Sequence, residues 1–339
     1  MVNFGIIGFG LHGDKRLMPG FLRSRNCRVM AVQRRDPQKL EATAKQYNIP
    51  EAHTSVEDLC QSPNIQAVLI TSPNSLHCDE VLTAAKYGKH ILCEKPMAMN
   101  AVESRRMVVA AQKANVLLGM AHVFRFTESV NRIKQWFESG QIGRPVFAHC
   151  NFSFHAPGNH PRKWLHDRSV AGGGPIADVG VHCIDTLRYL LSDEVTEVTA
   201  IGAKDDTSGD VEASAVLTLR FSRGTLATCS VSFRATYHTP LAIHGEKGVI
   251  SSYDGLPVEA LVTARLENDQ KIVNEESFDN QLAYAKQADE FADAVEGKVK
   301  FRASGEQGWQ NQLILDAAFR SLESGKSEPV QLVVERAVV

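Results

Sequence analysis

Two side chains that can move protons, Asp178 and His182, stand four residues apart directly after Gly172-Gly173-Gly174. Residues at this spacing share one face of a helix. A helix beginning at about Pro175 would offer unpaired backbone amides beside the Asp-His pair, and the glycines would let a ligand approach the backbone closely. The stretch therefore predicts a binding or catalytic site. The alternative is a buried helix in which His182 is a hydrogen-bonded polar residue of the core.

A second motif lies at the start of the chain, where residues 2–7 read as a buried strand followed at once by Gly8-Phe9-Gly10-Leu11-His12-Gly13. In this G-x-G-x-x-G pattern the first glycine permits a tight turn, the second lets the backbone approach a pyrophosphate, and the third allows close packing. The N-terminus of the following helix supplies amides and positive potential for phosphates. With a second strand at 28–33, this context favours dinucleotide binding over a plain glycine turn.

The residues after that second strand predict which dinucleotide is bound. Arg34 and Arg35 stand where an acidic side chain would accept hydrogen bonds from a ribose 2′-hydroxyl. A guanidinium can instead clamp a 2′-phosphate or lie flat on the adenine, so the pair favours NADP, with NAD still possible. Asp36 is the competing ribose reader, although Asp36-Pro37 also reads as a helix N-cap followed by proline. Two solvated arginines are the remaining alternative.

Strands and helices alternate up to residue 120, which predicts a doubly wound parallel sheet covered on both faces. Residues 1–122 are expected to form a dinucleotide-binding domain and residues 123–339 a second, substrate-binding and oligomerisation domain. Polar segments follow three of the predicted strands, at residues 71–77, 94–96 and 121–122, on the carboxyl edge where such sheets bind ligands. Lys95 lies in one of them, and the proline after it should hold the ammonium near the cofactor; the alternative is a surface lysine. The predicted cofactor-binding residues are Gly8, Phe9, Gly10, Leu11, His12, Gly13, Arg34, Arg35, Ser72, Pro73, Asn74, His77, Glu94 and Lys95.

The second half of the chain has the alternating pattern of an antiparallel sheet, with hairpin turns at 222–224 and 245–248. In the predicted strand 146–154, Phe152 and Phe154 share one face and Asn151 and Ser153 the other, and the sequence leaves open which face packs.

The loop 158–168 mixes charged and aromatic side chains just ahead of the Asp178-His182 helix. Such mixtures suit sugars, because an indole faces C–H groups while charged side chains bind hydroxyls. The alternative is that Trp164 fills a gap between domains and Arg162 lies in solvent. The predicted substrate-binding residues are Arg125, Phe152, Arg162, Trp164, Asp178 and His182.

Four segments together resemble the Gfo/Idh/MocA family, the oxidoreductases similar to glucose-fructose oxidoreductase and inositol dehydrogenase. They are the glycine motif at residues 8–13, Ser72-Pro73-Asn74-Ser75-Leu76-His77, Glu94-Lys95-Pro96, and the stretch from Gly172 to Asp185. The resemblance covers essentially the whole chain. It implies a Rossmann domain followed by an α+β domain with a large, open, mostly antiparallel sheet, a Lys95-Pro96 peptide that is often cis, and catalytic roles for Lys95, Asp178 and His182. Arg34 departs from the acidic residue common in NAD-using members.

Composition narrows the class of partner. The 339 residues carry 37 basic and 39 acidic side chains, for a net charge of −2, which argues against nucleic acid or an anionic membrane as the main partner. No apolar run is long enough for a membrane span, and the N-terminus lacks the pattern of a signal peptide, so a cytoplasmic protein is expected. The seven cysteines are scattered, which indicates neither disulfides nor a metal site; most should be reduced core residues.

These features lead to one hypothesis, an NADP-dependent oxidoreductase that moves a hydride between nicotinamide and a sugar-like ketone or secondary alcohol. Lys95 would stabilise charge on the carbonyl oxygen, His182 would deliver a proton, and Asp178 would orient the pair. The alternatives are an NAD-dependent inositol or aldose dehydrogenase, a dinucleotide-using glycoside hydrolase on the same fold, and a non-catalytic dinucleotide-binding regulator. A homodimer or homotetramer through the C-terminal sheet is expected.

Overall fold

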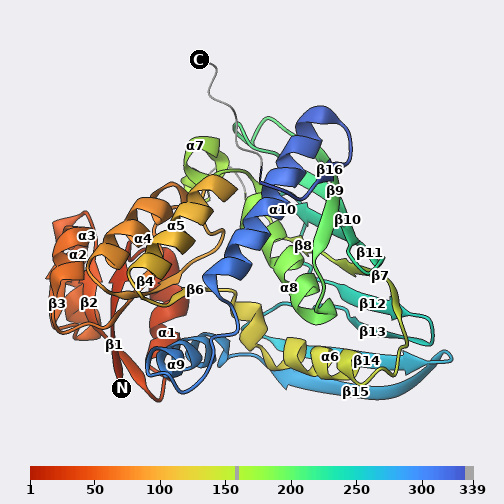
Figure 1. Cartoon of the computed structure of the whole chain (residues 1–339), viewed down its shortest axis with the longest axis horizontal. Helices are drawn as coiled ribbons and strands as arrows, with labels where there is room; N and C mark the ends of the chain where they lie inside the picture. The colour runs from red at the N-terminus through yellow and green to blue at the C-terminus, as the bar shows by residue number, and fades with distance from the viewer. Residues whose placement is uncertain (157–159, 333–339) are drawn as a thin grey trace. The chain divides into compact units, whose positions relative to one another are not determined.

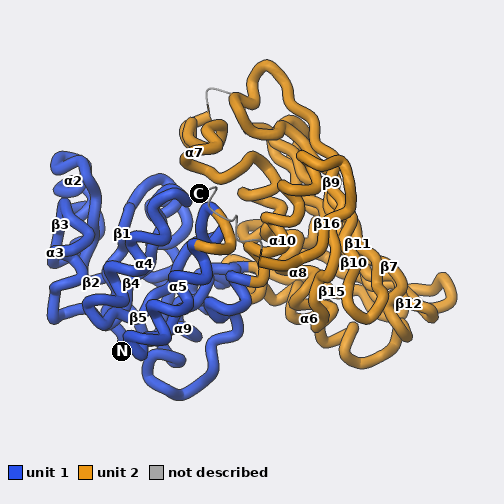
Figure 2. The backbone as a smooth tube through the Cα atoms, turned by 45° about the horizontal axis from the view of Figure 1, so that its top comes forward, with its two compact units in different colours: residues 1–99, 103–123, 282–309 blue, residues 100–102, 124–281, 310–339 orange. Residues whose placement is uncertain are grey.

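The computed structural model describes residues 1–156 and 160–332 and divides into two compact units. Unit 1 comprises Met1–Met99, Glu103–Val123 and Leu282–Trp309; unit 2 comprises Asn100–Val102, Phe124–Gln281 and Gln310–Val339 (Figure 2). The domain boundary after residue 122 stays a prediction. The compact units differ from it in two segments, because Asn100–Val102 packs with unit 2 and Leu282–Trp309 packs with unit 1. There Gly20 lies so close to Tyr284 that a Cβ atom at Gly20 would come within 2.6 Å of that side chain.

Unit 1 is built on a six-stranded sheet in the order β3-β2-β1-β4-β5-β6 (Figure 1). All five neighbouring pairs are parallel, as the alternation of strands and helices predicts. The order reverses between β1 and β4, and ligands of such sheets bind in the crevice at that point. The strands are β1 (Val2–Ile7), β2 (Cys27–Gln33), β3 (Glu51–His53), β4 (Ala67–Ile70), β5 (His90–Cys93) and β6 (Leu118–Met120).

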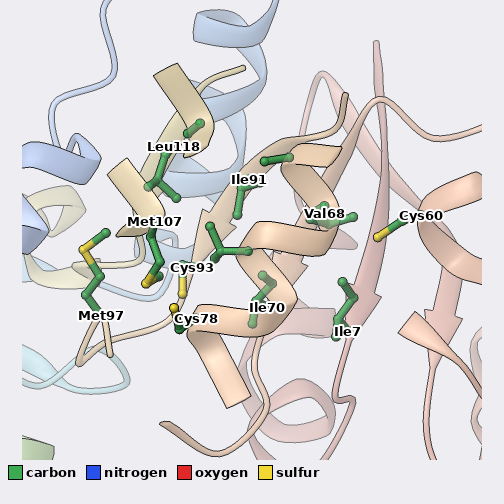
Figure 3. Packing of buried hydrophobic residues seen from close by; sticks show 14 of the residues in the cluster. Ile7, Cys60, Val68, Ile70, Cys78, Ile91, Cys93, Met97, Met107 and Leu118 are labelled. Atoms are coloured by element: carbon green, nitrogen blue, oxygen red, sulfur yellow. The ribbon is translucent and has the colours of Figure 1, made fainter. Parts of the chain in front are cut away.

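The central strands β4 and β5 are apolar and almost entirely buried, as expected for parallel strands with helices on both sides of the sheet. Ile70 and Ile91 from neighbouring strands are fully buried and belong to one core cluster with Met107 (Figure 3). The helical segments of this unit are η1 (Gly13–Leu17), α1 (Met18–Phe21), α2 (Pro37–Tyr47), α3 (Val56–Gln61), η2 (Asn74–Leu76), α4 (His77–Lys86), α5 (Ala101–Lys113, from Glu103 on) and α9 (Ala283–Val295).

Unit 2 is built on a ten-stranded sheet in the order β15-β14-β13-β12-β7-β11-β10-β9-β16, with β8 also paired to β11. The pairs are antiparallel except those of β11 with β7 and β8. The α/β class with a parallel Rossmann sheet and a large, mostly antiparallel second sheet is therefore confirmed. The strands are β7 (Pro145–Cys150), β8 (Phe152–Ser153), β9 (Val195–Ala203), β10 (Ser214–Phe221), β11 (Leu226–Ser232), β12 (Leu241–Gly245), β13 (Gly248–Ser252), β14 (Leu261–Asn268), β15 (Lys271–Asp279) and β16 (Glu328–Pro329).

One face of this sheet is covered and the other is open. In β10 every second residue, including Leu217 and Leu219, is buried, whereas Val216, which precedes Leu217, and its β9 partner Ile201 are exposed. The period of two assigns the buried set to the face that helices cover. The helical segments of unit 2 are η3 (Val123–Phe126, from Phe124 on), α6 (Glu128–Glu138), η4 (Lys163–His166), α7 (Arg168–Ala171), η5 (Ile176–Gly180), α8 (Val181–Leu191) and α10 (Gly305–Ser324, from Gln310 on).

The predicted strand 146–154 is broken at Asn151 into β7 and β8. The Asn151 side chain accepts a hydrogen bond from the backbone N–H of Ser230 at 3.0 Å, a bond that a strand backbone would otherwise make. The sequence pattern missed this break because a side chain competes there with the ladder.

Candidate functional site

The glycine motif forms the turn between β1 and the first helix of unit 1. Gly8 has a φ of 72°, and a Cβ atom there would come within 2.7 Å of the Ser72 backbone, so only glycine fits. At Gly10 a Cβ atom would meet nothing closer than the Gly8 carbonyl oxygen at 3.8 Å. At Gly13 it would lie 3.0 Å from the Phe9 ring, so the third glycine makes room for that ring. The open backbone at Gly10 fits the close approach of a pyrophosphate.

Gln33, a residue that the sequence analysis missed, fixes this turn. Its side-chain oxygen accepts a hydrogen bond from the Gly8 N–H at 3.0 Å, and its own carbonyl accepts one from Phe9 N–H at 3.1 Å. Its side-chain nitrogen donates to the Thr54 carbonyl at 3.0 Å. A buried amide directly after the apolar run of residues 29–32 was the available signal.

Arg34 is held beside the glycine turn. Its Nη1 donates to Thr43 Oγ1 of α2 at 2.7 Å, and its guanidinium carbon lies 5.9 Å from the centre of the Phe9 ring. Arg35 is exposed. Asp36 is the N-cap of α2, accepting hydrogen bonds from the Gln38 and Lys39 amides, both at 3.1 Å. The N-cap role predicted for Asp36 is confirmed.

The loops after β4 and β5 are tied together by His77, which is fully buried. Its Nε2 lies 2.9 Å from the Ser72 carbonyl oxygen and its Nδ1 lies 3.0 Å from that of Pro96. Burial lowers the pKa of His77, and a neutral imidazole donates one of these two bonds. The Lys95-Pro96 peptide is cis, as the family resemblance implies. His77 thus joins the loop that contains Ser72 to the loop that contains Lys95.

Glu94 connects the loop after β5 to the glycine motif. Its Oε1 lies 3.0 Å from Nε2 of His12, and its Oε2 accepts a hydrogen bond from the Lys95 N–H at 3.2 Å. Burial acts to raise the pKa of Glu94, but His12 and Lys95 outweigh it and hold that pKa below its usual range. The buried Glu94 carboxylate therefore connects the loop after β1 to the loop after β5.

In unit 2, Asp178 lies on η5 and His182 on α8, and both are buried. The His182 ring packs edge-on against the Phe124 ring, with 4.7 Å between the ring centres, and stacks on the Phe152 ring, with 6.0 Å between the centres. Arg162 Nη2 lies 3.9 Å from Asp178 Oδ2. These residues form an aromatic-walled group around one imidazole, one carboxylate and one guanidinium.

The same arrangement settles which face of the strand 146–154 points to this group. Phe152 faces His182, whereas Asn151 and Ser153 line a groove of about 500 Å³ on the open face of the sheet with Ile201 and Val216. Both η1, beside the cofactor motif, and η5, which carries Asp178, are π-helical, a local widening that is common at functional sites.

The N-terminus of the Asp178 helix is closed by Glu212, which the sequence analysis also missed. Its buried Oε1 accepts a hydrogen bond from the Ile176 N–H at 2.9 Å, and Gly174 leaves no room for a Cβ atom, which would lie 2.2 Å from the Glu212 carbonyl oxygen. The prediction that this helix end offers its amides to a ligand is therefore wrong at Ile176, because the chain supplies its own carboxylate there.

The other predicted substrate residues are placed as follows. Arg125 is 2% exposed, and its Nε and Nη2 donate to the two oxygens of Asp185 at 2.9 and 2.6 Å. Trp164 is partly buried against a small cluster of Ala156, Leu165 and Phe233. Gly158 and Asn159, at the start of the predicted substrate loop, lie outside the described residues. Contact of Arg125, Phe152, Arg162 and Trp164 with a substrate stays a prediction.

The described ranges 1–156 and 160–332 contain neither a metal-binding cluster nor a helix that could span a membrane. Within them no group of three His, Cys, Asp or Glu side chains could hold a metal ion. The seven cysteines are free and buried, as predicted. No helix in the part of the chain that the structure describes is long and apolar enough to cross a membrane.

Comparison with known proteins finds two family models along the chain. Residues 2–122 match the oxidoreductase family with an NAD-binding Rossmann fold, and residues 130–251 match the GFO/IDH/MocA C-terminal domain. The 1,5-anhydro-D-fructose reductase of Ensifer adhaerens is 31% identical over 310 residues, covering 91% of this chain and 92% of that protein. D-xylose 1-dehydrogenase (NADP(+)) 2 of Haloferax volcanii is 29% identical, covering 95% and 98%. The crystal structure of an aldose-aldose oxidoreductase from Caulobacter crescentus shares the fold, with a TM-score of 0.88 at 23% identity over 97% and 99% of the two chains.

Proposed function

The chain belongs to the Gfo/Idh/MocA family of NAD(P)-dependent oxidoreductases, and we propose that it uses NADP to reduce a sugar-like ketone, or to oxidise the corresponding secondary alcohol. The observation that carries the cofactor choice is the position of Arg34. Its guanidinium is anchored to Thr43 beside the glycine turn, at the end of the second strand, where an acidic residue would read a free ribose. A planar guanidinium suits a 2′-phosphate.

The backbone of unit 1 has the features that support dinucleotide binding. The turn at Gly8 and the open backbone at Gly10 suit the pyrophosphate, and the helix that follows supplies its N-terminus. His77, bonded to the Ser72 carbonyl, and Glu94, bonded to His12, hold the neighbouring loops in place. A bound nicotinamide dinucleotide supplies or accepts the hydride.

The chain's own residues manage the proton and the developing charge. In the reducing direction negative charge grows on the substrate carbonyl oxygen, and the Lys95 ammonium stabilises it. His182 delivers the proton, because an imidazole can both donate and accept one. Asp178, on the preceding helical turn, orients the pair, and Arg162 lies 3.9 Å from its carboxylate. Phe124 and Phe152 restrict the His182 ring to one orientation.

For the substrate we propose a neutral sugar ketone or a deoxy- or anhydro-sugar. The rings of Phe152 and Phe154, 6.5 Å apart, give an apolar wall for the C–H face of a sugar. The names of the relatives, which include an anhydrosugar reductase and an NADP-dependent sugar dehydrogenase, support the same class.

We further propose a homodimer or homotetramer formed through the open face of the unit 2 sheet. The paired residues Ile201 and Val216 lie on this face and are 75 and 49% exposed, and Leu226 on the same face is 42% exposed. Exposed apolar residues of this kind mark an interaction surface. Replacing Val216 by aspartate should reduce the molar mass measured by light scattering.

The test of the function is a screen of sugars, polyols and dicarbonyls with NADPH, NADH and their oxidised forms, followed at the nicotinamide absorbance. NADPH-dependent reduction of a ketosugar, absent in Lys95→Ala, would support the proposal. Oxidation of inositol or an aldose with NAD, or release of sugar from a glycoside without added cofactor, would contradict it.

A further inference from the structure

Thr43, on α2, is buried and bonded to Arg34, the residue to which the cofactor choice is assigned above. Thr43 is 4% exposed, and its Oγ1 donates to the Lys39 carbonyl oxygen, one helical turn earlier, at 2.8 Å. A hydroxyl has one hydrogen to donate, so Thr43 accepts the other bond, from Nη1 of Arg34 at 2.7 Å. Thr43 therefore presents an acceptor of fixed direction to the guanidinium.

The face of α2 that carries Thr43 also packs on the glycine motif. Tyr47 lies one turn later on this face, and its ring centre is 5.9 Å from that of Phe9. The Tyr47 hydroxyl donates to Asp14 Oδ1 of η1 at 2.7 Å. The guanidinium carbon of Arg34 is 5.9 Å from the centre of the same Phe9 ring. Thr43 thus holds Arg34 from a helix that is itself fastened to the glycine motif.

The bond to Thr43 fixes Arg34 without cancelling its charge. A guanidinium has five N–H donors, and in the part of the chain that the structure describes Thr43 takes one of them while no carboxylate pairs with Arg34. A carboxylate at the place of the Thr43 hydroxyl would also orient the guanidinium, but it would compete with a bound phosphate. A neutral acceptor leaves the remaining donors and the full positive charge for an anion.

We propose that Thr43 is a positioning residue for the cofactor: its hydroxyl holds Arg34 in the orientation that binds the 2′-phosphate of NADP, and it has no effect on NAD. The inference rests on the proposed role of Arg34 in binding NADP. An arginine side chain loses rotamer freedom when it binds a phosphate. The bond to Thr43 restricts the side chain before the cofactor arrives, so less entropy is lost on binding.

The experiment is calorimetric binding of NADP, NAD and adenosine 2′,5′-bisphosphate, which has the 2′-phosphate but no nicotinamide, to the wild type, Thr43→Val and Thr43→Ser. Valine has the shape of threonine without the hydroxyl, whereas serine keeps the hydroxyl. Thr43→Val should raise the Kd for NADP and for the bisphosphate about threefold to tenfold, the scale of one immobilised side chain, and leave the Kd for NAD unchanged. Thr43→Ser should bind all three like the wild type.

Two controls separate this role from a merely structural one. Thr83→Val on α4 removes the same kind of bond, because the Thr83 hydroxyl donates to the Asp79 carbonyl at 2.8 Å and no arginine of the described ranges bonds to it; this variant should bind NADP normally. In an Arg34→Ala background, Thr43→Val should leave the Kd for NADP unchanged, since Thr43 acts only through Arg34. Urea denaturation checks the fold of each variant, and Thr43→Ala, which favours the helix, replaces Thr43→Val if valine impairs folding.

The possible failures are distinguishable. If Arg34→Ala weakens NADP binding but Thr43→Val does not, the inference on Thr43 is wrong and the proposed cofactor stands. An equal loss for NAD, a loss in Thr43→Ser as large as in Thr43→Val, or an effect that persists without Arg34 would also overturn the inference alone. If Arg34→Ala keeps the NADP affinity of the wild type, the proposed role of Arg34 is wrong, and the role of Thr43 falls with it.

Discussion

The Glu212 carboxylate accepts a hydrogen bond from the backbone N–H of Ile176 at 2.9 Å, and so a side chain next to β10 closes the start of the helix that carries Asp178 and His182. Glycine is required at position 174 because the Glu212 backbone occupies the place of a side chain. The glycine run thus serves contact within unit 2, where it lets a buried acid reach the helix end.

This contact gives unit 2 a pH dependence with a definite sign. Burial raises the pKa of Glu212 in the folded protein, so the unfolded chain loses this proton at a lower pH than the folded chain. The contribution of Glu212 to the free energy of unfolding is therefore greatest below the unfolded pKa and falls as pH rises towards the folded pKa. Glu212→Gln keeps the acceptor and removes the titration, so it should gain stability relative to wild type between about pH 5 and about pH 8.

Urea denaturation at both pH values measures the difference. Glu212→Ala is the matched variant, because it leaves the Ile176 N–H buried without its partner and should cost about 1–3 kcal/mol at either pH. A stability difference between Glu212→Gln and wild type that is constant with pH would contradict the assignment.

Arg125 can be tested as a structural or a substrate-binding residue. Its guanidinium is bound by Asp185 on α8, and the Asp185 carboxylate also accepts a hydrogen bond from Asn311 at 2.8 Å. Removing one partner of a buried pair costs about 3–5 kcal/mol because the other charge remains buried. Arg125→Met should therefore lower the urea midpoint strongly, and Arg125→Met with Asp185→Leu should recover part of the loss. Unchanged stability with a raised KM would instead place Arg125 against the substrate.

Cofactor preference should depend on Arg34. Arg34→Asp replaces a cation beside the glycine turn with a charge that repels a 2′-phosphate and can accept hydrogen bonds from a free ribose. The variant should lose at least about tenfold in kcat/KM with NADPH while losing far less with NADH. Steady-state kinetics with both cofactors decides the matter, and a retained NADPH preference would remove Arg34 from the cofactor site.

Turnover should depend on Lys95 and on His182. Removing a group that stabilises charge or transfers a proton costs about 100-fold or more in kcat, whereas binding of the distant adenine end needs neither side chain. Lys95→Ala and His182→Ala should therefore both bind the dinucleotide and fail to turn over. Fluorescence titration serves as the control for binding, and near-normal turnover of either variant would exclude the proposed mechanism.

The sequence predicted the fold well because its two hydrophobic periods are regular. Apolar runs between helical segments predicted β1, β2, β4, β5 and β6. The alternation of apolar and polar residues predicted β9 to β14, and the hairpins form at the expected turns. Short β3 and β16 carry too few residues for a pattern. The polar strand β15 is exposed over most of its length, so no hydrophobic alternation marks it.

The candidate site was predictable where a motif carries its own chemistry and was missed where a side chain acts on another segment. The turn at Gly8 and the cap at Asp36 follow from local rules. Gln33 and Glu212 bind backbone groups across the fold, at Gly8 and Ile176, and nothing near them in the sequence names those partners. A buried polar residue at the edge of an apolar strand, Gln33 at the end of β2 and Glu212 just before β10, was the signal in both, but it does not identify what the residue binds.

The substrate should be an unphosphorylated sugar, and the charges around Asp178 explain why. A phosphate needs cations that are not already matched by carboxylates. Within the described part of the substrate loop, Arg162 lies 3.9 Å from Asp178, and Arg168 lies 3.5 Å from Glu323 and over the Phe319 ring. Phe152 and Phe154 offer ring faces, which suit C–H groups. The kcat/KM for a ketosugar should therefore exceed that for its phosphate ester.

The sugar and its ester are compared at fixed NADPH, with Arg162→Gln as the variant that would lose a phosphate contact if one existed. A kcat/KM about tenfold higher for the ester, abolished in Arg162→Gln, would show that the basic loop binds phosphate.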